Sequence, residues 1–180
     1  MDVLQTKHQL DSSCDYHMAR LLLILDVFTG DEEWMRGITK LVKLDFLLRY
    51  PTYLERALER RNASTRSLRI EDHERASIES TMVRYRFGPW DARYRSWLNV
   101  LVSRGLLEIS VSGRTVHMRI TPLGGSVAAR VRETTEYETL AQRVRVLHTH
   151  LDLTATGLTR FIYDTFPALS DMRLGEEITR

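Results

Sequence analysis

The amino-acid sequence predicts a mainly α-helical protein with a small β-sheet, an α+β fold, and three observations support this prediction. First, apolar residues recur at helical spacing along most of the 180 residues. Second, the spacing changes from a period of 3.6 to a period of 2 within residues 107–120. Third, Gly105 and Gly113 stand where the chain has to turn before and within that stretch.

Residues 91–104 are predicted to form the helix around which the rest of the chain is arranged. Asp91 can cap its N-terminus, and Gly105 supplies a left-handed residue that ends it. The apolar residues follow the i, i+3, i+4, i+7, i+8 spacing of a helix with one buried face. They are Tyr94, Trp97, Leu98, Leu101 and Val102, of which we expect Trp97, Leu98 and Leu101 to be deeply buried.

The period-2 stretch after this helix predicts a β-hairpin. Apolar and polar residues alternate in both strands, and Ser112-Gly113 suits a two-residue turn because glycine tolerates positive φ. The alternating apolar residues are Leu107, Ile109, Val111, Val116, Met118 and Ile120. Pro122 then fits the first turn of a new helix. A helix, a hairpin and a further helix in this order are typical of the back half of a winged helix-turn-helix.

Two long helices are predicted before this unit. They cover about residues 14–28 and 38–49, and the apolar stripe of the second leaves Lys43 on its polar side. Pro51 breaks or restarts the chain, and a short helical piece follows over residues 52–58.

The segment that leads to the 91–104 helix is predicted to contain a loop and a strand. Residues 59–69 are polar and rich in Ser and Arg, which is typical of a loop. Residues 82–87 alternate between apolar residues and arginines, so they can form a third, edge strand beside the hairpin.

The chain after the hairpin is predicted to be helical. The helices cover about residues 122–132, 136–151 and 154–166. We therefore predict a winged-helix domain over residues 1–132, with an N-terminal arm at 1–12 and an insertion at about 51–70. Residues 133–180 are predicted to be a C-terminal helical extension for partner docking or dimerisation.

Composition indicates an ordinary globular chain. Charged residues make up 28% and the formal net charge is +2, so the whole molecule has no strong cationic field. The single cysteine, Cys14, excludes an intrachain disulfide and fits a reducing compartment. The longest apolar run, residues 21–25, is too short to cross a bilayer. We therefore expect a cytoplasmic protein with no membrane partner.

The sequence favours no catalytic or cofactor chemistry. Cys14 and His17 would share a helix face, but a zinc site needs three or four convergent ligands, and the remaining histidines are scattered. Gly124-Gly125 lacks the Lys-Ser/Thr of a phosphate-binding loop. We expect no enzyme activity, no cofactor and no metal.

A basic surface on the 91–104 helix and the strands is the candidate nucleic-acid interface. In winged helices that bind DNA, the helix before the hairpin enters the major groove and the wing contacts backbone or minor groove. The candidate residues are Arg84, Arg86, Arg93, Arg95, Arg104, Arg114 and Arg119. The alternatives are a solvated arginine face or an acidic protein partner.

A second candidate surface is apolar and would bind a protein partner. It combines the apolar lines of the two C-terminal helices with the aromatic turn at Phe87 and Trp90, because interfaces favour aromatic and arginine anchors. Its residues are Phe87, Trp90, Leu140, Val144, Leu147, Leu158, Phe161 and Ile162. The alternative is that these helices close the core and that Trp90 plugs it.

Three blocks of the sequence resemble a bacterial defence family. They are ITKLVKLDFLLRYPTYLERAL (38–58), MVRYRFGPWDARYRSWLNVLVSRGLLE (82–108) and RITPLG (119–124), with KLDFLLRYP and RYRFGPWD the most telling parts. The chain resembles the small middle component of three-component ABC-ATPase systems, among them the Lamassu-type anti-phage and anti-plasmid systems. The resemblance covers about residues 38–125.

The resemblance implies a non-catalytic adaptor subunit. Its partners would be an SMC/Rad50-like ABC ATPase and an effector, often a nuclease, and it would link the ATPase heads, DNA sensing and the effector. Double-stranded DNA is a further possible partner. The alternative function is a winged-helix transcriptional regulator that binds DNA as a homodimer.

Overall fold

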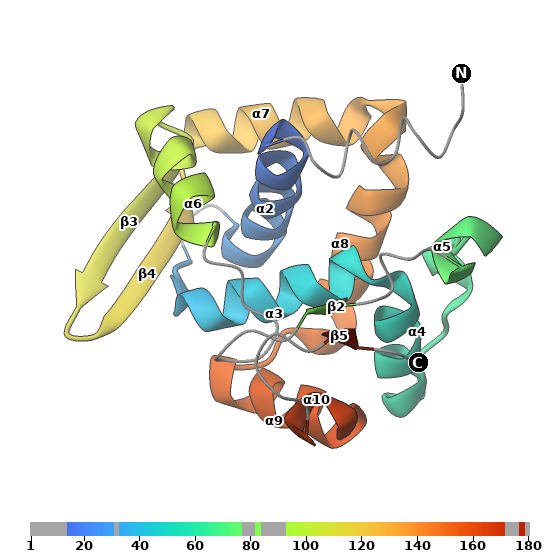
Figure 1. The fold of residues 1–180 in the computed structure, drawn as a ribbon. Coiled ribbons are helices and arrows are strands. Elements are labelled where there is room, and N and C mark those ends of the chain that lie inside the picture. Colours follow the sequence, from blue (N-terminus) through green and yellow to red (C-terminus); the bar gives the residue numbers. More distant parts are fainter. Residues whose placement is uncertain (1–13, 31–32, 77–81, 84–92, 172–176, 179–180) are drawn as a thin grey trace.

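The computed structural model describes residues 14–30, 33–76, 82–83, 93–171 and 177–178, and it is mainly helical with a small three-stranded antiparallel sheet (Figure 1). This confirms the predicted α+β class. In chain order the elements are α2 (Cys14–Thr29), β1 (Met35–Arg36), α3 (Ile38–Arg49), α4 (Pro51–Arg60), η1 (Arg66–Leu68), α5 (Asp72–Ala76), β2 (Met82–Val83), α6 (Tyr94–Ser103), β3 (Leu107–Ser112), β4 (Thr115–Ile120), α7 (Pro122–Glu133), η3 (Thr135–Tyr137), α8 (Glu138–Leu151), α9 (Ala155–Thr165), α10 (Ala168–Asp171) and β5 (Glu177–Ile178).

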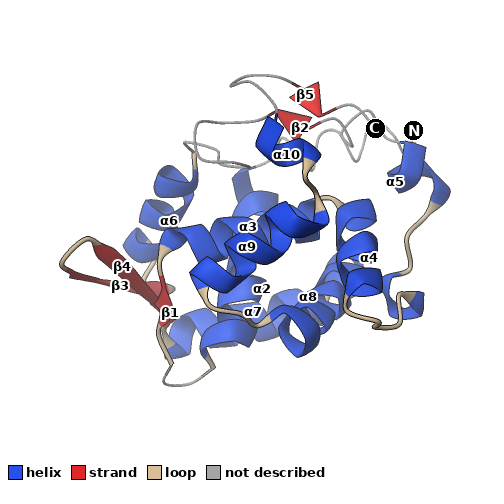
Figure 2. Ribbon diagram, turned by 90° about the horizontal axis from the view of Figure 1, so that it is seen from below, coloured by secondary structure: helices blue, strands red, loops and turns tan. Residues whose placement is uncertain are grey.

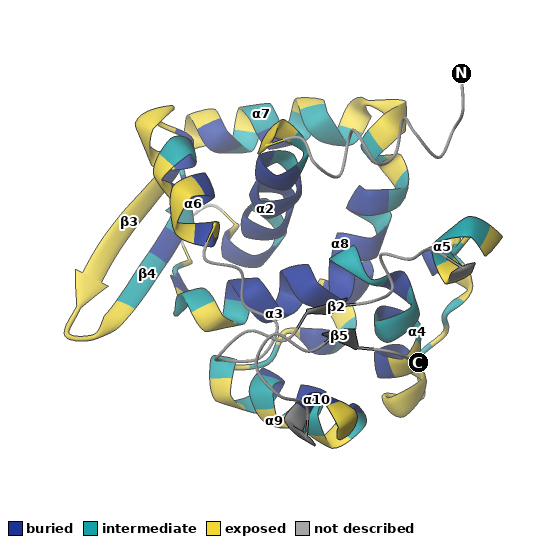
Figure 3. Cartoon of the chain, in the orientation of Figure 1, coloured by how far each residue is buried: buried dark blue, intermediate teal, exposed yellow. Residues whose placement is uncertain are grey.

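Helix α2 lies at the centre of the molecule. It contacts α3, α6, α7 and α8 as well as strand β4, so it is buried on almost every side (Figure 3). Its run from Leu21 to Leu25 is entirely buried, as expected for a helix that is apolar all round.

Helix α3 spans the predicted residues, but its polar side is not in solvent. All residues from Leu41 to Leu48 are buried, including the charged Lys43 and Asp45. The side of α3 predicted to be polar, which carries Lys43, is therefore covered within the folded chain. Helix α9 covers that side of α3, and the Lys43 ammonium lies 4.9 Å from the centre of the Tyr163 ring.

The three-stranded sheet has the order β1–β4–β3, and all its strands are antiparallel to their neighbours. The third strand is β1, where Met35 pairs with Met118. The prediction that residues 82–87 lie beside the hairpin is wrong for the described part, because Met82 pairs with Ile178 in a separate two-stranded sheet. Residues 84–87 lie outside the described residues.

The hairpin turn is one residue later than predicted. Ser112 pairs with Thr115, so the two turn residues are Gly113 and Arg114, and Gly113 has the positive φ of 61° that a tight hairpin requires at this position. The hairpin projects from the helical body (Figures 1 and 2). For this reason Leu107 at its base is buried, whereas Ile109 is exposed.

Helix α6 ends as predicted at Gly105, which has a φ of 70°. The Gly105 amide donates to the Val102 carbonyl at 2.9 Å, and the Leu106 amide donates to the Leu101 carbonyl at 2.9 Å, which is a Schellman motif. Trp97, Leu98 and Leu101 are buried as expected. Val102 was placed on the buried face and is exposed instead, because α6 ends beside the base of the hairpin and nothing in the described chain covers that side.

Helix α7 begins very close to the base of β3. A Cβ at Gly124 would lie 2.1 Å from the Leu106 carbonyl oxygen, which is too close for any side chain. Thr121 caps the helix by accepting from the Gly124 amide at 2.9 Å. Gly124 therefore allows the close approach of α7 and the hairpin base.

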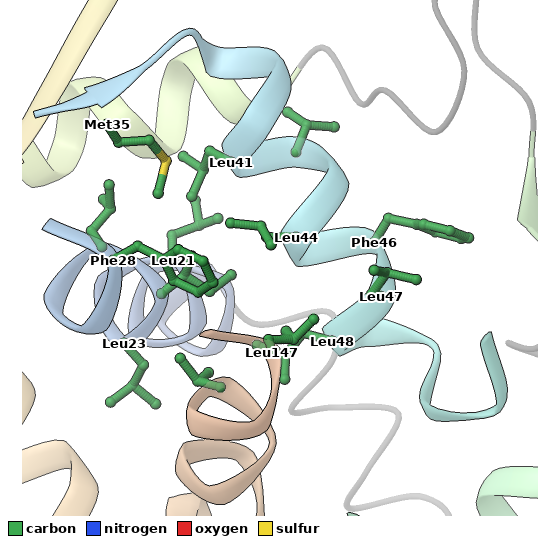
Figure 4. Packing of buried hydrophobic residues seen from close by; sticks show 14 of the residues in the cluster. Leu21, Leu23, Phe28, Met35, Leu41, Leu44, Phe46, Leu47, Leu48 and Leu147 are labelled. Carbon is green, nitrogen blue, oxygen red and sulfur yellow. The ribbon is translucent and has the colours of Figure 1, made fainter. Parts of the chain in front are cut away.

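The C-terminal helices belong to the same core as α2 and α3. Helix α8 packs on α2 and α3, and α9 packs on α3 and α4. Figure 4 places Leu147 of α8 beside Leu48 of α3. Residues 138–169 thus complete the core and do not project from it as an extension.

The predicted insertion also packs on this core. Leu68, within the segment expected to be a loop, is fully buried in the 3-10 helix η1 against α8. The Arg143 guanidinium of α8 donates to the Leu68 carbonyl at 2.8 Å and to the Glu74 carboxylate at 2.7 Å and 2.9 Å. These bonds fix the segment between α4 and α5.

Candidate nucleic-acid interface

A buried polar network holds helix α6 against the core. The Asp45 carboxylate of α3 accepts hydrogen bonds from the Tyr94 hydroxyl of α6 and from the Arg20 guanidinium of α2, the latter in bidentate fashion. All three side chains are buried. Burial and the charge of Asp45 raise the pKa of the Tyr94 hydroxyl well above its usual value, so it stays a donor.

His17 supports the same helix through its ring. The imidazole stacks on the Trp97 indole, with ring centres 4.3 Å apart, and its Nδ1 lies 3.1 Å from Arg20 Nη2. Because a guanidinium only donates, Nδ1 accepts and the ring is neutral. Burial, followed by the positive charges of Arg20 and Arg49, lowers the pKa of His17 from 6.5 to about 4.

The opposite face of α6 is exposed and polar. Arg95, Ser96 and Asn99 lie in solvent along this face. The guanidinium of Arg93, at the N-cap position, lies 5.3 Å from the centre of the Trp97 ring. Helix α6 has 10 residues and is therefore about 15 Å long, a length that fits in a major groove.

The polar face of the sheet adds further cations. Arg114 is exposed in the hairpin turn. Arg119 lies 4.7 Å from the centre of the Trp34 ring and donates to Glu108 at 2.7 Å, so part of its charge is neutralised. Arg36 is exposed on β1, next to its strand partner His117.

The predicted basic residues therefore form two groups, one on α6 and one on the sheet. Arg93 and Arg95 lie at the start of α6, whereas Arg104 lies at its other end, 3.8 Å from the Asp15 carboxylate. Arg114 and Arg119 belong to the hairpin. Arg84 and Arg86 lie outside the described residues.

The predicted partner-binding residues of the C-terminal helices are in the core. Five of them are buried and Phe161 is half-buried, so they are not available to a partner. The buried residues are Leu140, Val144, Leu147, Leu158 and Ile162. The physical reason is that α8 and α9 turn these apolar lines toward α2, α3 and α4. Phe87 and Trp90 lie outside the described residues.

The sequence reasoning missed two features of this region. The first is the Arg20–Asp45 pair, although one acid and one arginine within two leucine-rich helices are a signal for a buried ion pair. The second is the contribution of β1, which brings Trp34 and Arg36 beside the hairpin. Only the tertiary pairing of β1 with β4 makes this second feature visible.

Three comparisons with known proteins give no counterpart: no family model, no curated protein and no solved structure matches the chain. Within the described residues, no three His, Cys, Asp or Glu side chains are close enough together to hold a metal ion. No helix in the described ranges is long and apolar enough to cross a membrane.

Proposed function

We propose that this chain is a winged-helix protein that contacts duplex DNA through helix α6 and the β3–β4 hairpin. The order of its core elements supports the fold: α2, β1 and α3 precede α6, and the hairpin follows α6 directly. Strand β1 pairs with β4, so it supplies the third strand expected beside a wing. The segment from α4 to α5 is then an insertion between the second and third helices of the unit.

Helix α6 is the candidate recognition helix. Its buried side is anchored by Tyr94 and Trp97, so its exposed side is presented on a rigid support. Arg95 and Asn99 are four residues apart on that side. Arginine pairs well with guanine and asparagine with adenine in the major groove, while most of the affinity comes from phosphate contacts.

The observation that carries the proposal is that α6 and the hairpin turn each present an exposed arginine that can bind a phosphate. Arg75 binds Glu55, Arg69 binds Glu138 and Arg143 binds Glu74 around the insertion and α8. By contrast, Arg95 and Arg114 form no ion pair with any described carboxylate, so phosphates can bind them without competition.

The test is a fluorescence anisotropy titration of labelled duplex DNA. The variant carries Arg93→Glu, Arg95→Glu and Arg114→Glu, and the matched control carries the same charge change at the exposed Arg60, Arg66 and Arg145. We expect the first variant to lose binding by at least about 100-fold and the control to bind within a few-fold of the parent chain. Equal losses in both variants would contradict a defined interface.

We propose further, from the sequence resemblance alone, that the chain acts as an adaptor beside an SMC-like ABC ATPase and a nuclease effector. In that setting, α6 and the hairpin bring DNA to the ATPase. Co-expression with any SMC-like ATPase and nuclease encoded beside it, followed by purification through a tag on this chain, tests the assignment. A stable complex of the three proteins supports the adaptor, and recovery of this chain without them contradicts it.

The second candidate function is a winged-helix transcriptional regulator that acts as a homodimer. It rests on the same α6 and hairpin geometry, since burial of the apolar lines of α8 and α9 removes them as a docking surface for an ATPase and as a dimer interface alike. A lone dimer that binds one short promoter fragment more tightly than other duplexes supports the regulator.

A further inference from the structure

The exposed apolar side chains of the described residues gather at one place. The large hydrophobic side chains that remain exposed are Val102 (40%), Ile109 (36%), Val111 (67%) and Leu123 (55%). Ile109 and Val111 lie on β3, and the other two lie at the base of the hairpin, where Leu123 is close to Gly105. The hairpin extends beyond the helices that cover its base and is exposed along most of β3 (Figure 3), so the apolar side chains of Ile109 and Val111 are in solvent there.

Strand β3 is also an edge of the sheet, since only β4 pairs with it in the described chain. Natural proteins usually protect such edges with a proline, a lysine, a bulge or a very short strand. Strand β3 has six residues in continuous register with β4, and its sequence LEISVS contains neither proline nor lysine.

The hydrogen bonds of the hairpin determine which backbone groups face outward. The Val116 carbonyl accepts from the Gly37 amide at 2.8 Å on the β1 side, so Val116 and its partner Val111 do not exchange hydrogen bonds. Because the two kinds of pair alternate along an antiparallel ladder, the Ile109 pair is of the same kind. The amide and carbonyl groups of Ile109 and Val111 therefore point to the open edge, and the apolar side chains of these two residues are exposed as well.

We propose that β3 pairs in antiparallel fashion with β3 of a second copy of this chain, about a two-fold axis through Ser110, so that two three-stranded sheets form one of six strands. The proposal does not depend on DNA binding. It follows from the self-complementarity of this edge, which is what a two-fold interface requires.

The register through Ser110 is the one that matches both faces. On the apolar face, Ile109 lies opposite Val111 of the second copy, and the two-fold axis repeats this pair. The outward backbone groups of these residues can therefore hydrogen-bond across the interface while their β-branched side chains contact each other. On the polar face, Ser110 lies opposite Ser110 and Glu108 lies opposite Ser112, so no like charges face each other.

The neighbouring registers fit less well. An axis through Ile109 would place Val111 of the second copy opposite Leu107, whose side chain is already covered by the core. An axis through Val111 would place Ile109 opposite Gly113, which offers no side chain to contact. A single pair of edges is a small interface, so we expect a dimer that forms only at micromolar or higher protein concentration.

The test is symmetric disulfide trapping in the full chain with the exposed Cys14 replaced by serine. Ser110→Cys places two thiols opposite each other in a pair that is not hydrogen-bonded, at a Cα separation of about 4.5 Å, which a disulfide can bridge. Ser112→Cys is the matched control on the same strand face, because its copies would lie about four residues, or roughly 13 Å, apart.

We expect Ser110→Cys to form a crosslinked dimer at least about 10-fold faster than Ser112→Cys, given the distances in the two pairs. In sedimentation equilibrium, Val111→Lys should abolish the concentration-dependent dimer of the uncrosslinked chain, because it places a charge in the apolar pair. Equal crosslinking of the two cysteine variants, or a parent chain that stays monomeric at every concentration, would overturn the proposal. Crosslinking that needs the co-expressed ATPase would also overturn it, since the edge would then belong to a different partner.

Discussion

Helices α8 and α9 and the β3–β4 hairpin are both built on lines of apolar side chains, but these lines lie in opposite environments. Leu147 and Ile162 are fully buried among α2, α3 and α4, whereas Ile109 and Val111 are exposed beyond the end of the helical body. Both regions carry apolar side chains, so the difference in burial comes from whether other elements of the chain cover them.

The comparison shows which surfaces remain for other molecules. Burial of the C-terminal apolar lines stabilises the fold, so these residues are not available for recognition. The hairpin and the exposed side of α6 contribute less to the core and keep both apolar and cationic groups in solvent. Substitutions in α8 and α9 should therefore reduce the stability of the fold, whereas substitutions in the hairpin and on the exposed side of α6 should affect association with other molecules.

The largest effect is expected in the core, at Asp45. Asp45→Ala leaves the buried Arg20 guanidinium without its carboxylate and should reduce the free energy of unfolding by about 3–5 kcal/mol. Urea denaturation followed by circular dichroism measures it. The double variant Arg20→Met/Asp45→Leu is the control and should recover part of the loss, because it removes both charges but leaves the Tyr94 hydroxyl without its acceptor. A single variant as stable as the parent chain would contradict the buried pair.

A matched pair of truncations compares the two regions directly. Leu147→Ala creates a cavity beside Leu48 and should cost about 2–5 kcal/mol of unfolding free energy. Val111→Ala should change it by less than about 0.5 kcal/mol, because that side chain is already in solvent. Similar values for the two variants, from urea midpoints at equal m-values, would remove the distinction between buried helices and exposed hairpin.

The pH dependence of stability tests how tightly α6 is held on α2. The pKa of His17 in the folded chain, about 4, is below its usual 6.5, so the unfolded chain binds more protons between these values. The contribution of His17 is complete above pH 6.5 and is lost as the pH falls toward 4, up to about 3 kcal/mol. His17→Gln should flatten this part of the profile of unfolding free energy against pH, and an unchanged slope would contradict the neutral, buried ring.

A smaller loss of stability is expected where α6 joins the hairpin. Gly105→Ala places a side chain at a φ of 70° and should cost about 1–2 kcal/mol. Its Cβ would meet only Leu123, at 3.9 Å, so the cost comes from the backbone. Thermal unfolding compared with Ser103→Ala, a change within the helix before the turn, measures it. A Gly105→Ala variant with the parent melting temperature would contradict the left-handed turn.

The helices and the hairpin could be predicted because their signals are local. The apolar spacing of α3, Gly105 after α6 and Pro122 at the start of α7 each act within a few residues. What covers each element depends on residues far away in the chain. For this reason the sequence did not predict the burial of Lys43 or the exposure of Val102. The pairing of β1 with β4 is also long-range, and two residues are too few to give a strand pattern.

The candidate interface was predictable only in part, for the same reason. Arg93, Arg95 and Arg114 follow from the helix and hairpin patterns, which are local. The C-terminal partner surface was predicted from apolar lines that α2, α3 and α4 cover in the folded chain. A line of leucines at helical spacing predicts that a helix has one apolar face. It does not predict whether that face packs against the same chain or against another protein.

The salt dependence of duplex DNA binding tests the proposed role of α6 and the hairpin most directly. The logarithm of the binding constant should fall linearly with the logarithm of salt concentration, with a slope of about −4 to −5 for four to six phosphate contacts. Reversal of Arg93, Arg95 and Arg114 should reduce the magnitude of this slope by about 3, whereas reversal of Arg60, Arg66 and Arg145 should leave it unchanged. A parent chain without a salt-dependent affinity for duplex DNA, or the same slope in both triple variants, would contradict the proposed interface.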